Sequence, residues 1–105
     1  MAITNVKVQS AELTRLFLAV GEQAVTTMFF CNQSVSTDCA LDIYVVPAGQ
    51  PVDSGTQIIK SLPLAKTETF VFDAEKLILE AGDSIWSQST IDQIVTATIS
   101  SVQTS

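Results

Sequence analysis

The residues that usually carry acid-base and nucleophilic chemistry are scarce in this chain. It contains no histidine, which removes the commonest general base and the Ser-His arrangement that activates a hydroxyl nucleophile. Cys31 and Cys39 are its only thiols, too few for a structural zinc site and without an imidazole to pair with. No glycine-rich phosphate loop follows a strand and opens a helix. The sequence predicts a protein that is not an enzyme and that has no catalytic residue, cofactor or metal site.

Carboxylates are the only plentiful reactive groups, and the densest cluster is Asp73, Glu75, Glu80 and Asp83. Hard cations such as Ca²⁺ take several oxygen ligands, but this spacing matches no EF-hand loop. A glycosidase would need two carboxylates in a cleft, for which a domain of this size has little room. A solvated acidic face is therefore preferred to a calcium site.

The two cysteines lie symmetrically about Val35. If the flanking strands form a hairpin centred there, Cys31 and Cys39 face each other across the pair, and a disulfide is geometrically possible. The chain begins without the basic and apolar regions of a signal peptide, and in such proteins cysteines are usually reduced. The alternative is two free thiols that pack in the interior.

Two aromatic residues, Tyr44 and Trp86, are candidates for a platform that binds sugar or protein, because both present a large area with few rotamers to freeze. Each also lies in a stretch with strand alternation. A place in the core or at its edge is the alternative for both.

The charge of the chain argues against two classes of partner. The formal net charge is −6, from 11 acidic and 5 basic residues, and the basic residues are scattered along the chain, which argues against a phosphate-binding surface for nucleic acid. No apolar run approaches the ~20 residues of a membrane-spanning helix. We expect no nucleic acid or membrane partner, and synthesis and retention in a cytoplasm.

The elements that would position these residues are short strands. Hydrophobic residues make up 47% of the 105 residues, and β-branched residues recur between turn residues every 8 to 12 positions. This spacing predicts one all-β domain over 1–105, an antiparallel β-sandwich or jelly roll of about eight strands. Residues 1–8 would form an arm or edge strand, and 103–105 a frayed tail. The expected strands are Ile3–Val8, Leu13–Val20, Gln23–Asn32, Cys39–Val46, Thr56–Leu62, Thr67–Phe72, Leu77–Leu79, Ser84–Ser89 and Ile94–Val102.

Two segments depart from this strand pattern. Asp73 could cap a helical turn that Gly82 would end, so at most one short turn is expected near 73–77. The run from Pro47 to Gly55 holds two of the three prolines and two of the four glycines, which predicts a protruding loop suited to contacts.

Two stretches carry a resemblance to a known class of protein. The segment FDAEKLILEAGDSIWSQS, followed by the last strand VTATISSV, resembles the C-terminal half of small bacteriophage virion proteins. Upstream, Leu41 to Gly49 is similar to an "LxIYVVPAG" strand of such proteins, and Leu77 to Ile85 to their "LVLEAGDSI" turn. The resemblance implies a β-sandwich subunit present in many copies on a phage particle, as capsid cement or decoration, or in the neck, tail or baseplate.

The functional prediction is a structural subunit of the virion, made in the host cytoplasm, most simply a capsid cement protein. Its partners would be the major capsid or tail and neck proteins and further copies of itself. The alternative is a small carbohydrate- or receptor-binding module. Contacts are expected from the arm, the Pro47 to Gly55 loop, the tail after Val102 and the aromatic pair. The candidate contact residues are Ile3, Val6, Val8, Pro47, Gln50, Pro51, Val52, Asp53, Tyr44 and Trp86.

Overall fold

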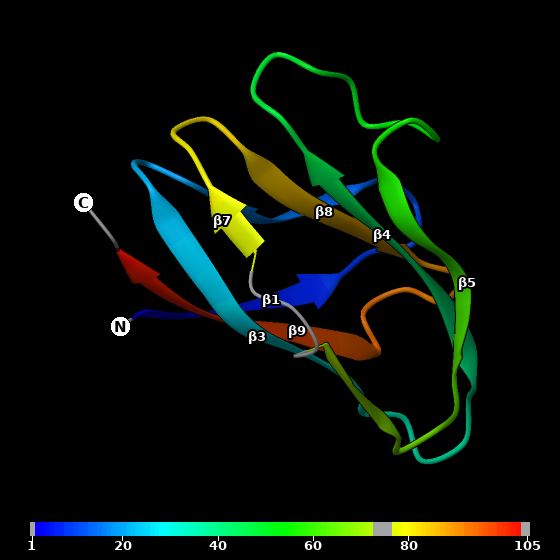
Figure 1. The fold of residues 1–105 in the computed structure, drawn as a ribbon. Helices are drawn as coiled ribbons and strands as arrows, with labels where there is room; N and C mark the ends of the chain where they lie inside the picture. The colour runs from blue at the N-terminus through cyan, green and yellow to red at the C-terminus, as the bar shows by residue number, and fades with distance from the viewer. Residues whose placement is uncertain (1, 73–76, 104–105) are drawn as a thin grey trace.

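The structure, a computed structural model, describes residues 2–72 and 77–103 and is all-β, with two antiparallel sheets packed against each other (Figure 1). The predicted β-sandwich is confirmed. The helical turn predicted near 73–77 falls mostly outside the described residues, and Leu77 begins a strand. The strands are β1 (Ala2–Val8), β2 (Thr14–Leu18), β3 (Gln23–Asn32), β4 (Cys39–Val46), β5 (Gln57–Leu64), β6 (Thr69–Phe72), β7 (Leu77–Leu79), β8 (Ser84–Ser89) and β9 (Val95–Gln103).

Sheet A has the order β1-β9-β3-β6, with β7 also paired to β3, and sheet B has the order β2-β8-β4-β5. The long strand β3 pairs with β9 on one side and with both β6 and β7 on the other. Strand β1 pairs with β9 from Ala2 to Val8, so the N-terminal segment is an edge strand. Gln103, predicted to lie in a frayed tail, instead ends β9 opposite Gln23.

Alternation along the strands divides core from surface. In β9 the buried apolar residues are Val95, Ala97 and Ile99, and in β3 Met28 and Phe30 point to the same interior. Phe70 of β6 packs against this core, with its ring centroid 6.5 Å from that of Phe30. Each of the larger side chains of this set stabilises the fold by roughly 1.5–3 kcal/mol when it is fully buried. The sandwich is therefore held by the facing apolar surfaces of its two sheets.

Strand β5 differs from the expected strand, which was predicted to stop before Pro63. It continues to Leu64, with Pro63 opposite Ala40. Proline is tolerated there because β5 is the edge of sheet B. The pairing of β5 with β4 also shifts register twice, and Ser61 has a φ of 55°. This edge is irregular, a feature that discourages further strands from adding to it.

One buried polar residue ties the two sheets together. Asn32, at the end of β3 in sheet A, is completely buried. Its Nδ2 donates to the carbonyl oxygen of Leu64 in sheet B at 3.1 Å and to that of Thr37 at 2.9 Å. Its Oδ1 accepts from the backbone N–H of Ser34 at 2.9 Å. Because buried polar groups are costly when unpaired, these bonds fix how β3 and β5 meet.

The connections after β4 and before β8 meet at one end of the sandwich (Figure 1). Asp83 accepts from the backbone N–H of Ala48 through Oδ1 and from that of Glu80 through Oδ2, both at 2.9 Å. Gly82 has a φ of 92°, and a Cβ placed there would lie 2.9 Å from the Cβ of Ala48. Glycine is required at this point by both conformation and space.

Candidate functional site

The acidic cluster has no metal-binding geometry in the part of the chain that the structure describes. No three His, Cys, Asp or Glu side chains of residues 2–72 and 77–103 gather closely enough to hold an ion. Both carboxylate oxygens of Asp83 are already used by backbone N–H groups of the turn. Asp73 and Glu75 lie outside the described residues. Asp83 thus acts as a structural residue of the β7–β8 turn.

The two cysteines are free, and the hairpin that would have paired them is absent, because β3 lies in sheet A and β4 in sheet B. Cys31 is half-buried and sits opposite Thr96 and Thr69 of the neighbouring strands. Cys39 is buried. Burial raises the pKa of the Cys39 thiol, a hydrogen bond with Ser89 lowers it, and the nearby Asp38 carboxylate raises it. Desolvation is the largest of these effects, so Cys39 is a packing thiol and a poor nucleophile.

Tyr44 and Trp86 come together on the outer face of sheet B. They lie directly opposite each other across the β4–β8 pair, and both are half-buried. Trp86 also faces Arg15 of β2, and Tyr44 faces Gln57 of β5. We call these four residues, Arg15, Trp86, Tyr44 and Gln57, the aromatic row. The indole Nε1 of Trp86 donates to Ser84 Oγ at 2.8 Å, which holds the ring in place. Neither aromatic residue belongs to the buried core between the sheets.

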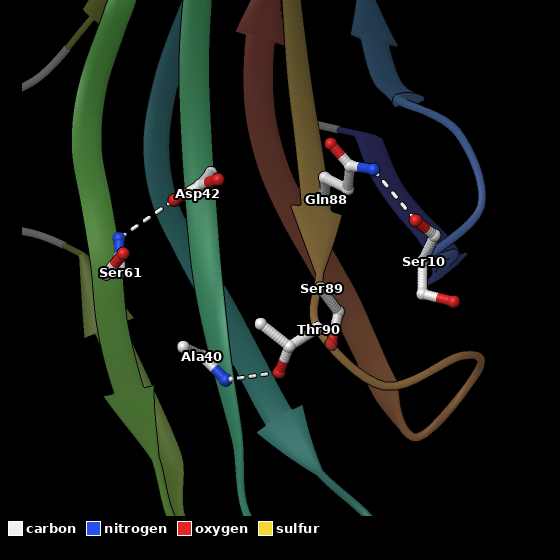
Figure 2. A pocket seen from close by; sticks show the side chains of 7 residues that line it. All are labelled: Ser10, Ala40, Asp42, Ser61, Gln88, Ser89 and Thr90. Carbon is white, nitrogen blue, oxygen red and sulfur yellow. Dashed lines mark hydrogen bonds between the residues drawn. The ribbon is translucent and has the colours of Figure 1, made fainter.

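A polar pocket of about 210 Å³ includes Asp42 and Gln88 in its lining (Figure 2), and these residues lie two positions along β4 and β8 from Tyr44 and Trp86. Asp42 of β4 points toward β5 and accepts from the backbone N–H of Ser61 at 2.8 Å. Gln88 of β8 points the other way, and its Nε2 donates to the carbonyl oxygen of Ser10 at 2.8 Å. The pocket is lined by Ser10, Ala40, Asp42, Ser61, Gln88, Ser89 and Thr90.

A second hollow, of about 410 Å³, lies beneath the Pro47 to Gly55 loop. Two of the predicted contact residues, Pro47 and Gln50, line it together with Gln57 of the aromatic row. Pro51 and Asp53 are exposed and Val52 is half-buried. Asp53 shapes the loop through its Oδ1, which accepts from the backbone N–H of Gly55 at 2.8 Å. The loop is therefore ordered by its own hydrogen bonds.

The outer face of sheet A is apolar at four positions. Ile3, Phe29, Val71 and Ile78, which we call the apolar face, are 67%, 40%, 42% and 59% exposed. They come from β1, β3, β6 and β7, and the register places Phe29 directly opposite Val71. Between them lie the hydroxyl groups of β9 and β3. The five strands of sheet A contain no acidic residue and one basic residue, Lys7.

The predicted contact residues of the N-terminal strand differ in their exposure to solvent. Ile3 is exposed, whereas Val6 is half-buried and packs against the core. Val8 is completely buried, so the prediction that it makes external contacts is wrong. Val6 and Val8 share one side of β1, and that side faces the interior. Phe29, Val71 and Ile78 were not among the predicted contact residues; for Phe29 the reason is that the strand Gln23–Asn32 is largely apolar on both faces, which is typical of a strand at the centre of a sandwich.

No helix among the described residues is long and apolar enough to span a membrane. No protein-family model, no curated protein and no solved structure matches the chain.

Proposed function

We propose that this chain is a non-enzymatic structural subunit of a bacteriophage particle that stabilises the particle through protein–protein contacts. Part of the support is the resemblance of Leu41 to Gly49 and Leu77 to Ile85 to segments of virion proteins. In the folded chain these two segments touch, since Ala48 of the first is bonded to Asp83 of the second and packs against Gly82. The two segments that carry the resemblance therefore include two turns that contact each other in the folded protein.

The observation that carries the proposal is the apolar face. The molecule has a net charge of −6, yet the strands of sheet A contribute no carboxylate. A neighbouring protein can therefore cover Phe29 and Val71 without burying an unpaired negative charge. Exposed apolar patches on a soluble domain commonly mark an interaction surface.

The edge of sheet A offers a second means of association. Strand β1 pairs with β9 through seven consecutive residues without a register shift. Its free side presents backbone groups to which a neighbour can add a strand. The edges of sheet B are less suitable, because β2 and β5 both have register shifts in their pairing. Further copies of this chain and a major capsid protein are the partners that we propose.

The test is the protein composition of purified particles, measured by quantitative mass spectrometry. We expect this chain in many copies per particle, as for capsid cement. A handful of copies would instead place it in the neck, tail or baseplate. Its absence from purified particles would show that the proposal is wrong.

Variants of the apolar face test the mode of contact. Phe29→Asp introduces a charge at the centre of this face, and we expect at least about tenfold fewer copies per particle, since an unpaired interfacial charge costs several kcal/mol. Ile58→Asp is the matched control, because Ile58 is 44% exposed but lies in β5 of sheet B. Equal incorporation of both variants would exclude the apolar face as the docking surface.

A further inference from the structure

We propose that the outer face of sheet B binds a neutral oligosaccharide, with sugar rings packed on Tyr44 and Trp86 and sugar hydroxyl groups in the adjacent polar pocket. This site is on the opposite sheet from the apolar face and does not depend on incorporation into a particle. It goes beyond a purely structural role, because it assigns the protein a small-molecule ligand.

The aromatic pair supplies the apolar part of the site. A pyranose ring has faces of C–H groups, and these pack on aromatic rings, which provide a large rigid area at a low entropic cost. Tyr44 and Trp86 are direct cross-strand neighbours, for which Cβ atoms lie about 4.5–5.5 Å apart. The hydrogen bond from Trp86 Nε1 to Ser84 Oγ orients the indole before a ligand arrives. The two side chains therefore start from neighbouring positions on one face, and the indole of Trp86 is held in a fixed orientation.

The polar pocket begins at the next outward-facing positions of β4 and β8. Asp42 lies two residues before Tyr44 in β4, and Gln88 lies two residues after Trp86 in β8. Two residues of a strand cover about 6.6 Å, which is close to the width of a sugar ring. Asp42 and Gln88 are themselves opposite each other across the strand pair. A sugar chain lying on the aromatic pair would thus extend toward a carboxylate and an amide on the same face.

The hydrogen-bonding groups of the pocket suit hydroxyl groups. Asp42 uses Oδ1 to accept from Ser61, and a carboxylate can accept further hydrogen bonds. Gln88 is held by its bond to Ser10, which fixes the direction of its amide. The hydroxyl side chains of Ser10 and Thr90 line the same pocket. Together these groups supply both donors and acceptors, which match the hydroxyl groups of a sugar.

Charge selects a neutral ligand. The carboxylate of Asp42 lies within the pocket, and the net charge of the chain is −6. A sialylated or uronic-acid sugar would be repelled by both. Arg15, the basic residue of the aromatic row, lies on the other side of Trp86 from Tyr44, and so is two strands away from Asp42. Neutral glucose or N-acetylglucosamine oligomers therefore fit the face better than anionic glycans.

The single tryptophan makes the test direct, because all indole fluorescence of this protein comes from Trp86. The probes are maltotriose, cellotriose and the N-acetylglucosamine trimer, each titrated to about 10 mM, with glycerol at equal hydroxyl concentration as the control. At that concentration a site with a dissociation constant of about 1 mM is nine-tenths occupied. We expect a saturable change in emission with at least one trisaccharide and none with glycerol.

Four variants that keep the fluorophore, three at the site and one control on the other sheet, locate the site. Tyr44→Ala should weaken binding at least about tenfold, whereas Tyr44→Phe, which retains the ring, should bind within about twofold of the unchanged protein. Asp42→Asn should weaken binding several-fold. Phe29→Ala, on the other sheet, should leave binding unchanged.

Two results would overturn the proposal. One is the lack of a saturable emission change with all three trisaccharides. The other is an affinity that Tyr44→Ala and Asp42→Asn leave unaltered, in variants whose circular dichroism shows an intact fold. Failure of either kind would leave the particle proposal standing, because that proposal is tested by composition.

Discussion

Asp83 Oδ1 accepts a hydrogen bond from the backbone N–H of Ala48 over 2.9 Å, joining two turns that lie 35 residues apart in the chain. The neighbouring Gly82 lies so close to Ala48 that its backbone leaves room for a hydrogen atom on Cα but not for a Cβ. The backbone N–H of Gly82 also donates to the carbonyl oxygen of Ala19 at 2.9 Å. Three connections of the sandwich are thereby fixed to one another at a single end.

Gly82→Ala should destabilise the protein more than Gly49→Ala. Both glycines have positive φ, but a Cβ at Gly49 meets no atom within 4 Å, whereas one at Gly82 meets Ala48. We expect a loss of about 1–2 kcal/mol for Gly49→Ala and a further 1–3 kcal/mol for Gly82→Ala. Chemical denaturation measures both. Adding Ala48→Gly to Gly82→Ala should recover part of the loss, and simple additivity of these two changes would contradict the contact.

Asn32→Asp should be more damaging than Asn32→Ala, although aspartate has nearly the same shape as asparagine. The Nδ2 of Asn32 donates to two carbonyl oxygens, and a carboxylate would turn its negative charge toward them in a buried site. We expect losses of about 2–4 kcal/mol for alanine and at least about 1 kcal/mol more for aspartate at neutral pH. The free energy of unfolding in urea measures both. Equal stability of the two variants would contradict the expected cost of a buried negative charge, and a loss near zero for Asn32→Ala would mean that the side-chain bonds of Asn32 are not needed.

The two thiols should react at different rates in the native protein. Cys39 is buried and its pKa is raised, whereas Cys31 is half-buried on the outer face of sheet A. Native alkylation followed by mass spectrometry should show modification of Cys31 at least about tenfold faster than of Cys39. Both should label at similar rates after unfolding. A mass two hydrogens lower before reduction would instead reveal a disulfide.

The single tyrosine provides a pH-dependent report on the candidate sugar site. Burial raises the pKa of Tyr44, and the Asp42 carboxylate raises it further. Asp42→Asn should therefore lower the pKa of Tyr44 without bringing it fully to the ordinary value near 10. The near-ultraviolet absorbance of the phenolate follows this titration. An unchanged titration in Asp42→Asn would show that the two side chains do not interact.

The raised pKa of Tyr44 makes the free energy of unfolding depend on pH in the alkaline range. Since the pKa of Tyr44 is higher in the folded than in the unfolded protein, the folded form retains its proton more strongly. The resulting stabilisation is complete below the unfolded pKa, about 10, and is lost as the pH rises through the folded value. The free energy of unfolding should fall over this alkaline interval, and it should fall less in Tyr44→Phe.

Local pattern was sufficient to locate most strands and the aromatic candidates. The alternation of Ile43 and Tyr44 predicts that they face opposite ways, and this is what β4 shows. The same alternation groups Val6 with Val8 but does not say which side of β1 faces inward. It therefore gave the wrong role to Val8. The strand predicted to end before Pro63 continues through it, because proline ends a central strand but is tolerated in an edge strand such as β5.

The sequence by itself determined an all-β sandwich without histidine chemistry, because periodicity, turn residues and composition are local properties of the chain. Only the tertiary structure decided which residues are neighbours. It separated Cys31 from Cys39 by placing their strands in different sheets, and it brought Tyr44 beside Trp86 and Asp42 beside Gln88. Those pairings depend on the register of β4 against β8. This register is set by how the apolar faces of both sheets fit together, which no local window of sequence contains.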